Sequence, residues 1–132
     1  MNKVYPKWSE LPNLDLYLDQ VLLYVNQLDS SSIVDDDKGL TSAMINNYVK
    51  NGHLDKPIKK KYNRKQLARL IVITCLKNVF SIQEISKTIN SLTSDGSSEE
   101  MYDNFVMCMN GEKRDGLADV IVAACDTVRL YK

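Results

Sequence analysis

The sequence has few of the residues that enzymes and metalloproteins place in their sites. Its 132 residues include one histidine, His53, and three widely spaced cysteines, Cys75, Cys108 and Cys125, with no CxxC pair. No HExxH, GxSxG or glycine-rich phosphate loop occurs, so the patterns typical of zinc, serine and nucleotide chemistry are absent. Each cysteine lies among apolar residues, which predicts reduced thiols in a core. We therefore expect neither an enzyme nor a bound metal or cofactor.

Long hydrophobic runs are also lacking. The longest, LIVITCL at 70–76, is far shorter than the roughly 20 apolar residues that cross a bilayer, and Thr74 interrupts it. No apolar stretch follows the opening MNKVYPKWSE, so we expect no secretory signal and no membrane association. With 44% hydrophobic and 26% charged residues, the composition is globular. The sequence predicts one cytoplasmic domain over residues 1–132.

Apolar residues recur at helical spacing along most of the chain, which predicts an all-α fold with about six helices. The first is expected from Leu14, after the start signals Pro12 and Asn13, to Leu28, and a polar loop with Asp35–Asp37 follows it. The others are expected near 42–51, 64–79, 82–92, 97–109 and 117–128. We place a core at about 14–92 and a C-terminal helical pair at about 97–131. The apolar faces of that pair, 101–109 and 117–128, predict a possible homodimer.

Local signals fix several helix ends. Thr41 or Ser42 can cap the second helix, and Gly52 can end it in a left-handed conformation. Capping boxes are expected where a polar cap precedes Glu or Gln by three positions, at Asn63–Gln66, Ser81–Glu84 and Ser97–Glu100. Pro57 divides HLDKPIKKKY (53–62), which favours a turn or small basic β-hairpin over a helix.

The absence of net charge conceals a strong segregation of charge. Residues 41–77 hold nine bases and one acid, Asp55, whereas each flanking part of the chain has four more acids than bases. A basic block between acidic flanks predicts a molecule with one positive side. A solvated face that only keeps the protein soluble is the alternative interpretation.

The helix expected near 42–51 separates into two faces. At about 100° per residue, Met44, Ile45, Tyr48 and Val49 fall on one side. The other side carries small and polar residues, namely Ser42, Ala43, Asn46, Asn47 and Lys50. Such a face suits a major groove, where asparagine pairs with adenine edges and lysine reaches phosphate or guanine. Taken alone, the two asparagines fit ordinary polar surface equally well.

The order of elements adds information. A short capped helix ending in NGHL is followed by basic residues up to Tyr62, then by a capped apolar helix and FSIQEI at 80–85. Over about residues 40–90 this order resembles the MerR-like winged helix-turn-helix superfamily. More narrowly, LPNLDLYLDQV, LTSAMINNYVK and KKKYNRKQLARLIVITCLKNVFSI resemble a bacterial family catalogued only as a domain of unknown function. Both resemblances imply a DNA-binding fold with a basic wing.

The resemblance also implies roles for particular residues. Ser42, Ala43 and Asn46 occupy the positions that would face DNA bases. The positions that would contact backbone phosphates are Asn47, Lys50, Lys59, Lys60, Lys61 and Arg64. The expected function is therefore sequence-specific binding of duplex DNA, as in a transcriptional regulator. The alternative is a protein-interaction module that uses the basic block against an acidic partner.

Overall fold

The computed structural model describes residues 5–28, 39–78, 80–94, 96 and 98–110. Within them the fold is mostly helical, with five α-helices, one short 3-10 helix and a small antiparallel sheet of two strands. The elements are η1 (Trp8–Glu10), β1 (Leu16–Tyr17), α1 (Leu18–Leu28), α2 (Ser42–Lys50), β2 (Lys61–Tyr62), α3 (Arg64–Leu76), α4 (Ile82–Leu92) and α5 (Ser98–Met109). The predicted sixth helix, 117–128, and the Asp35–Asp37 loop lie outside the described residues.

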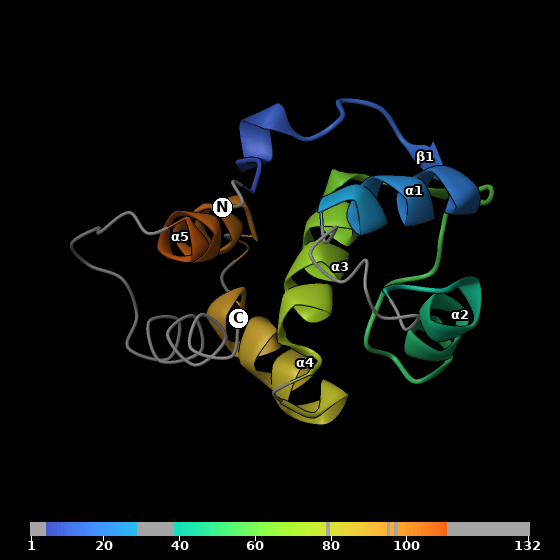
Figure 1. Ribbon diagram of the computed structural model, residues 1–132. Coiled ribbons are helices and arrows are strands. Elements are labelled where there is room, and N and C mark those ends of the chain that lie inside the picture. The colour runs from blue at the N-terminus through green and yellow to red at the C-terminus, as the bar shows by residue number, and fades with distance from the viewer. Residues whose placement is uncertain (1–4, 29–38, 79, 95, 97, 111–132) are drawn as a thin grey trace.

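Helix α3 is the centre of the core. Ten of its thirteen residues are buried, and it packs against α1, α4 and α5 (Figure 1). A helix that is apolar on all sides has to be surrounded by other elements, and LARLIVITCL provides apolar side chains around nearly the whole circumference. Arg69 is the one residue of this stretch, apart from the helix ends, that is only half-buried. It faces a pocket that is described below.

The predicted capping signals are confirmed where the structure describes them. The Thr41 hydroxyl accepts a hydrogen bond from the Met44 amide at 3.2 Å, and the Asn63–Gln66 and Ser81–Glu84 capping boxes are both formed. Each box satisfies backbone N–H groups that have no partner inside the helix. The predicted cap at Ser97 lies outside the described residues.

The first helix begins four residues later than predicted. Leu16 and Tyr17 form strand β1, which pairs with Tyr62 and Lys61 of β2, and α1 starts at Leu18. Leu14, expected on the apolar face of this helix, is 65% exposed. The helical spacing of leucines continued through this segment, but backbone hydrogen bonds to a distant strand determine its conformation instead. The prediction of a helix from Leu14 is therefore wrong for its first turn.

The N-terminal segment is fastened to α5. The Tyr102 hydroxyl donates to the Pro6 carbonyl at 2.8 Å, and the Trp8 amide donates to Asp103 Oδ1 at 2.7 Å. The Trp8 ring meets Tyr102 edge-on, with 6.2 Å between the ring centroids. Trp8 therefore packs against the core and covers it at this end.

The apolar residues of α5 face the interior of the same chain. Met101, Tyr102, Phe105 and Met109, which were expected to contribute to self-association, are all buried in the core.

Two cysteines are described, and they differ. Cys75 is a buried, reduced cysteine, as predicted. Cys108 is also buried but is disulfide-bonded. The expectation of reduced thiols is therefore wrong for Cys108.

A reciprocal pair of hydrogen bonds joins α1 to the residue before α2. The Leu40 amide donates to Asn26 Oδ1 at 2.8 Å, and Asn26 Nδ2 donates to the Leu40 carbonyl at 3.0 Å. Gly39 leaves the space for this contact, because a Cβ at that position would collide with Asn26 Oδ1. The start of α2 is thus positioned by a side chain of α1.

Replacing Gly39 by Ala should lower the free energy of unfolding by about 1–3 kcal/mol, because the methyl group displaces the Asn26 amide from two hydrogen bonds. Chemical denaturation of Gly39→Ala, Asn26→Ala and the double variant measures this. In the Asn26→Ala background the Gly39→Ala substitution should hardly change the free energy of unfolding, since the colliding atom is gone. Equal costs in the two backgrounds would show that the collision is not the cause.

Candidate nucleic-acid interface

Helix α2 has the two faces that its sequence predicts. Ile45 and Tyr48 are buried, and Met44 and Val49 are half-buried against the core. The residues predicted to face bases or phosphates, Ser42, Ala43, Asn46, Asn47 and Lys50, are all exposed. Asn47 Oδ1 accepts a hydrogen bond from Asn51 Nδ2 at 2.8 Å, whereas the Asn46 amide bonds to no residue of the described part. The helix therefore presents one small, polar face to solvent.

The end of α2 is fixed by its backbone. The His53 amide donates to the Tyr48 carbonyl at 2.8 Å, and the Gly52 amide donates to the Val49 carbonyl at 3.2 Å. Gly52 has a φ of 80°. These are the two bonds and the left-handed glycine of a Schellman motif. The predicted end of the helix at Asn51-Gly52 is confirmed, and the chain leaves it in a defined direction.

The predicted small basic hairpin is present as a tight turn. Ile58 and Lys61 exchange both backbone hydrogen bonds, each at 3.0 Å, so only Lys59 and Lys60 form the loop. Both have positive φ, 53° and 69°, which is the pattern of a type I′ turn. Such turns favour Asn-Gly, because a left-handed backbone costs other residues roughly 1–2 kcal/mol each. Here the chain instead places two exposed lysines at the tip.

The sheet holds this hairpin against the domain. Tyr17 lies opposite Lys61, which in turn lies opposite Ile58, so the three share one face of the sheet. Lys61 Nζ lies 5.2 Å from the centre of the Tyr17 ring, a cation–π contact. On the other face Leu16 and Tyr62 are buried. Ile58 is 69% exposed beside the lysines.

A buried glutamine positions the approach to the hairpin. Gln66 is 4% exposed, and its Nε2 donates to the carbonyls of Asp55 and Lys56 at 2.9 and 3.0 Å. Its Oε1 accepts from the Asn63 amide, on the far side of the hairpin, at 2.7 Å. One side chain therefore binds the backbone both before and after the turn.

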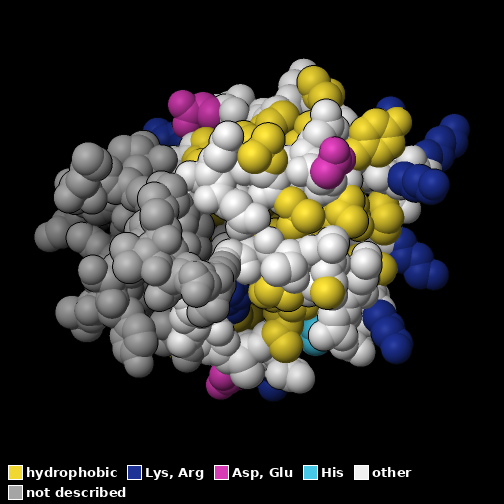
Figure 2. Space-filling model, turned by 45° about the vertical axis from the view of Figure 1, so that its right-hand side comes forward, with side chains coloured by type: hydrophobic (Ala, Val, Ile, Leu, Met, Phe, Trp, Pro, Cys, Tyr) yellow, Lys and Arg dark blue, Asp and Glu magenta, His cyan; other side chains and the backbone are white. Residues whose placement is uncertain are grey.

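Most of the predicted site residues lie on one side of the molecule. Helix α2 and the sheet are on the side opposite α5 (Figure 1). Basic side chains gather along that edge (Figure 2), and the exposed lysines of this region are Lys50, Lys56, Lys59 and Lys60.

Arg64 has a different role in the structure. Its Nη2 donates to Asn13 Oδ1 at 3.0 Å and to the Leu11 carbonyl at 3.5 Å, so its guanidinium ties the N-terminal segment to α3. Asp55, the single acid of the basic block, is exposed between α2 and the hairpin.

Three contributors to this region were not anticipated from the sequence. They are the strand Leu16–Tyr17, the Tyr17–Lys61 contact and the bonds from Gln66 to Asp55 and Lys56. Gln66 was recognised only as part of a capping box. Its second role depends on where the loop folds back, for which the sequence contains no local signal.

The chain matches a protein family over most of its length. Residues 6–105 match the family described as "Domain of unknown function (DUF1836)". The chain belongs to the DUF1836 family. The predicted resemblance to a family catalogued as a domain of unknown function is thereby confirmed, and the DUF1836 region includes α2, the hairpin and α3. No curated protein and no solved structure matches the chain.

Two further properties bear on the site. Within the residues that the structure describes, no helix combines the length and the apolar character needed to cross a membrane. The same residues contain no group of three or more His, Cys, Asp or Glu side chains placed to hold a metal ion.

Proposed function

We propose that this DUF1836 protein binds duplex DNA in a sequence-specific manner, as a transcriptional regulator with a winged helix-turn-helix arrangement. The observation that carries the proposal is the strained turn at Lys59 and Lys60. Residues held in an unfavourable backbone conformation cluster at functional sites. Two lysines at a position that favours Asn-Gly lower the stability of the domain but place two ammonium groups at the tip of a rigid hairpin.

Helix α2 would read the bases. Its exposed face begins with Ser42 and Ala43, which are small enough to let the helix approach a groove floor, and continues with Asn46. Because the Asn46 amide makes no bond within the described residues, both its donor and its acceptor are available to an adenine edge. Asn47 and Lys50 lie where they would meet the adjacent phosphates. The Schellman motif and the Asn26–Leu40 pair fix the two ends of this helix.

The hairpin would act as the wing. Lys59 and Lys60 project from its tip, and Lys61 is held on the Tyr17 ring. With the exposed Lys50 and Lys56, the proposal assigns five lysines to the contact with phosphates. Arg64 is not included, because its guanidinium already holds Asn13.

The first experiment is a fluorescence titration of random-sequence duplex DNA at several salt concentrations. If about five phosphates are neutralised, the logarithm of affinity should fall with the logarithm of salt concentration at a slope near −4.5. The variant Lys59→Ala/Lys60→Ala/Lys61→Ala should flatten that slope to about −2. The matched control, Lys7→Ala/Lys77→Ala/Lys87→Ala, removes the same charge from other elements and should keep the slope.

Two results would overturn the proposal. One is that the wild type does not bind DNA at low salt, and the other is that both triple variants lose DNA affinity equally. If random-sequence binding follows the expected pattern, selection of preferred sequences with wild type and Asn46→Ala tests the role of α2. Loss of preference without loss of general affinity is expected for that variant.

One observation favours a second candidate function. Ile58 and Leu14 are 69% and 65% exposed, and Tyr17 is 48% exposed, so large apolar side chains accompany the lysines of the sheet. Exposed apolar residues beside charges are typical of protein interfaces. An acidic protein partner would use both features. Failure to bind DNA at low salt, with capture of an acidic partner that depends on Ile58, would select this function.

A further inference from the structure

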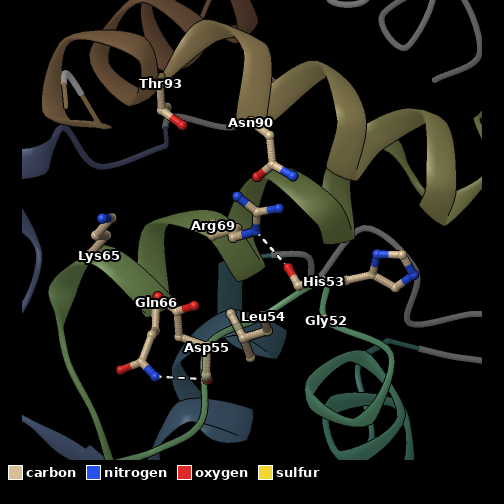
Figure 3. Close-up of a pocket in the computed structure, with 9 residues that line it drawn as sticks. All are labelled: Gly52, His53, Leu54, Asp55, Lys65, Gln66, Arg69, Asn90 and Thr93. Atoms are coloured by element: carbon tan, nitrogen blue, oxygen red, sulfur yellow. Dashed lines mark hydrogen bonds between the residues drawn. The ribbon is translucent and has the colours of Figure 1, made fainter. Parts of the chain in front are cut away.

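A pocket of about 230 Å³ opens between the segment that follows α2 and helices α3 and α4 (Figure 3). Gly52–Asp55 form one wall, Lys65 and Arg69 of α3 the second, and Asn90 and Thr93 the third. The walls come from three separate parts of the chain, so the pocket is a product of the tertiary fold. Nearly all its side chains are polar, which is unusual beside so apolar a helix as α3.

Arg69 is the central residue of the pocket. Its Nε donates to the His53 carbonyl at 2.6 Å and its Nη2 donates to Ser86 Oγ at 3.0 Å. A guanidinium has five N–H donors, so donors remain beyond these two bonds. Among the described residues, none forms an ion pair with Arg69. Burial lowers the pKa of the Arg69 guanidinium, and the Asp55 carboxylate partly offsets this.

The pocket carries both signs of charge around this guanidinium. In Figure 3 the Arg69 guanidinium lies next to the Asn90 amide, and Lys65, on the same helix as Arg69, and Asp55 also line the pocket. Arg69, Lys65 and the Asn90 amide are hydrogen-bond donors, whereas the Asp55 carboxylate only accepts when ionised. The Thr93 hydroxyl donates to the Ile89 carbonyl at 2.8 Å, so its hydrogen is already used and its oxygen remains as an acceptor.

We propose that this pocket binds a small anion that carries a hydrogen-bond donor of its own. Arg69, Lys65 and Asn90 bind the anionic oxygens, and Asp55 accepts the ligand's donor. An oxyanion without a donor is disfavoured, because its charge would face the Asp55 carboxylate with no proton between them. The shared chemistry fits a hydrogen phosphate group or a hydroxycarboxylic acid.

The site uses none of the residues proposed to contact DNA. The anion site can therefore be tested without nucleic acid, and the failure of one proposal would leave the other unaffected.

Thermal unfolding with matched pairs of probes tests the inference. Phosphate near neutral pH retains a proton that sulfate lacks, and lactate has a hydroxyl that propionate lacks. At equal ionic strength, phosphate, lactate or both should raise Tm in a saturable manner, and the donor-free counterparts should not. The pair that responds identifies the anionic group. General salt effects rise without saturation and act on every variant.

Three exposed pocket residues supply the variants. Lys65→Gln and Asn90→Ala should each raise the apparent Kd about tenfold, the effect of losing one charge-assisted or well-placed hydrogen bond. Asp55→Asn should remove the preference for phosphate over sulfate, since an amide can donate to either anion. Lys87→Gln, on the exposed part of α4, is the control and should leave the response unchanged.

Two outcomes would overturn the proposal. No saturable shift with any of the four probes means that the pocket binds no such anion. A saturable shift that is equal for phosphate and sulfate, and unchanged in Asp55→Asn, means an adventitious ion only.

Discussion

Replacing Lys59 by Asn and Lys60 by Gly should stabilise the protein and at the same time weaken the binding to DNA that we propose. Both lysines have a left-handed backbone, which costs an L-residue with a long side chain roughly 1–2 kcal/mol. Asn-Gly is the sequence that this turn favours. The free energy of unfolding, measured by chemical denaturation, should therefore rise by about 1–2 kcal/mol.

The same double variant removes two of the five proposed phosphate contacts. The slope of log affinity against log salt should become shallower by about 1.8, and affinity at ~0.1 M salt should fall about 10- to 100-fold. The DNA titration used for the wild type measures both quantities. An increase in stability with a loss of function at the same two residues is the pattern expected where selection has kept strain for activity.

Two controls separate strain from charge. Lys59→Ala/Lys60→Ala removes the same charges but keeps a Cβ at both left-handed positions, so it should lose DNA affinity equally and gain much less stability. Lys59→Arg/Lys60→Arg should retain both the stability and the DNA affinity of the wild type. Wild-type DNA affinity in the Asn-Gly variant would contradict a wing that contacts phosphate. Unchanged stability would contradict the strain argument.

The parts of this fold that sequence predicted correctly depend on local interactions. The cap at Thr41, the helix end at Gly52 and the Asn63–Gln66 box involve residues no more than five apart. The two faces of α2 follow from helical spacing alone, and the structure buries Ile45 and Tyr48 as expected. In such local patterns all the interacting residues lie within a short stretch, so the rest of the chain is not needed to predict them.

The features that sequence did not predict depend on contacts far along the chain. Leu16 and Tyr17 form a strand because β2 is available to pair with them, although their spacing fits the helix that follows. The small basic hairpin at 53–62 was predicted, but the left-handed backbone of Lys59 and Lys60 was not, since no propensity assigns two lysines to positive φ. For the pocket, the sequence contains one usable signal. Arg69 is a cation inside the apolar run of α3, and a partly buried cation needs polar partners.

The second large effect is expected at Gln66. Its Nε2 bonds to the Asp55 and Lys56 carbonyls, and its Oε1 bonds to the Asn63 amide. The nearly isosteric variant Gln66→Met removes all three bonds while filling the same space. The free energy of unfolding should fall by about 2–4 kcal/mol, because backbone groups beside the buried α3 lose their partners.

Binding to DNA distinguishes a positioning role for Gln66 from a contact role. All five lysines remain in Gln66→Met, so the slope of log affinity against log salt should stay close to that of the wild type. Affinity itself should fall several-fold, since a hairpin released at Asp55 and Lys56 has more orientations to lose on binding. Gln83→Met, on the exposed face of α4, makes the same chemical change without these bonds and should alter neither property. If the two methionine variants have equal stability and equal affinity, the three hydrogen bonds of Gln66 do not position the hairpin.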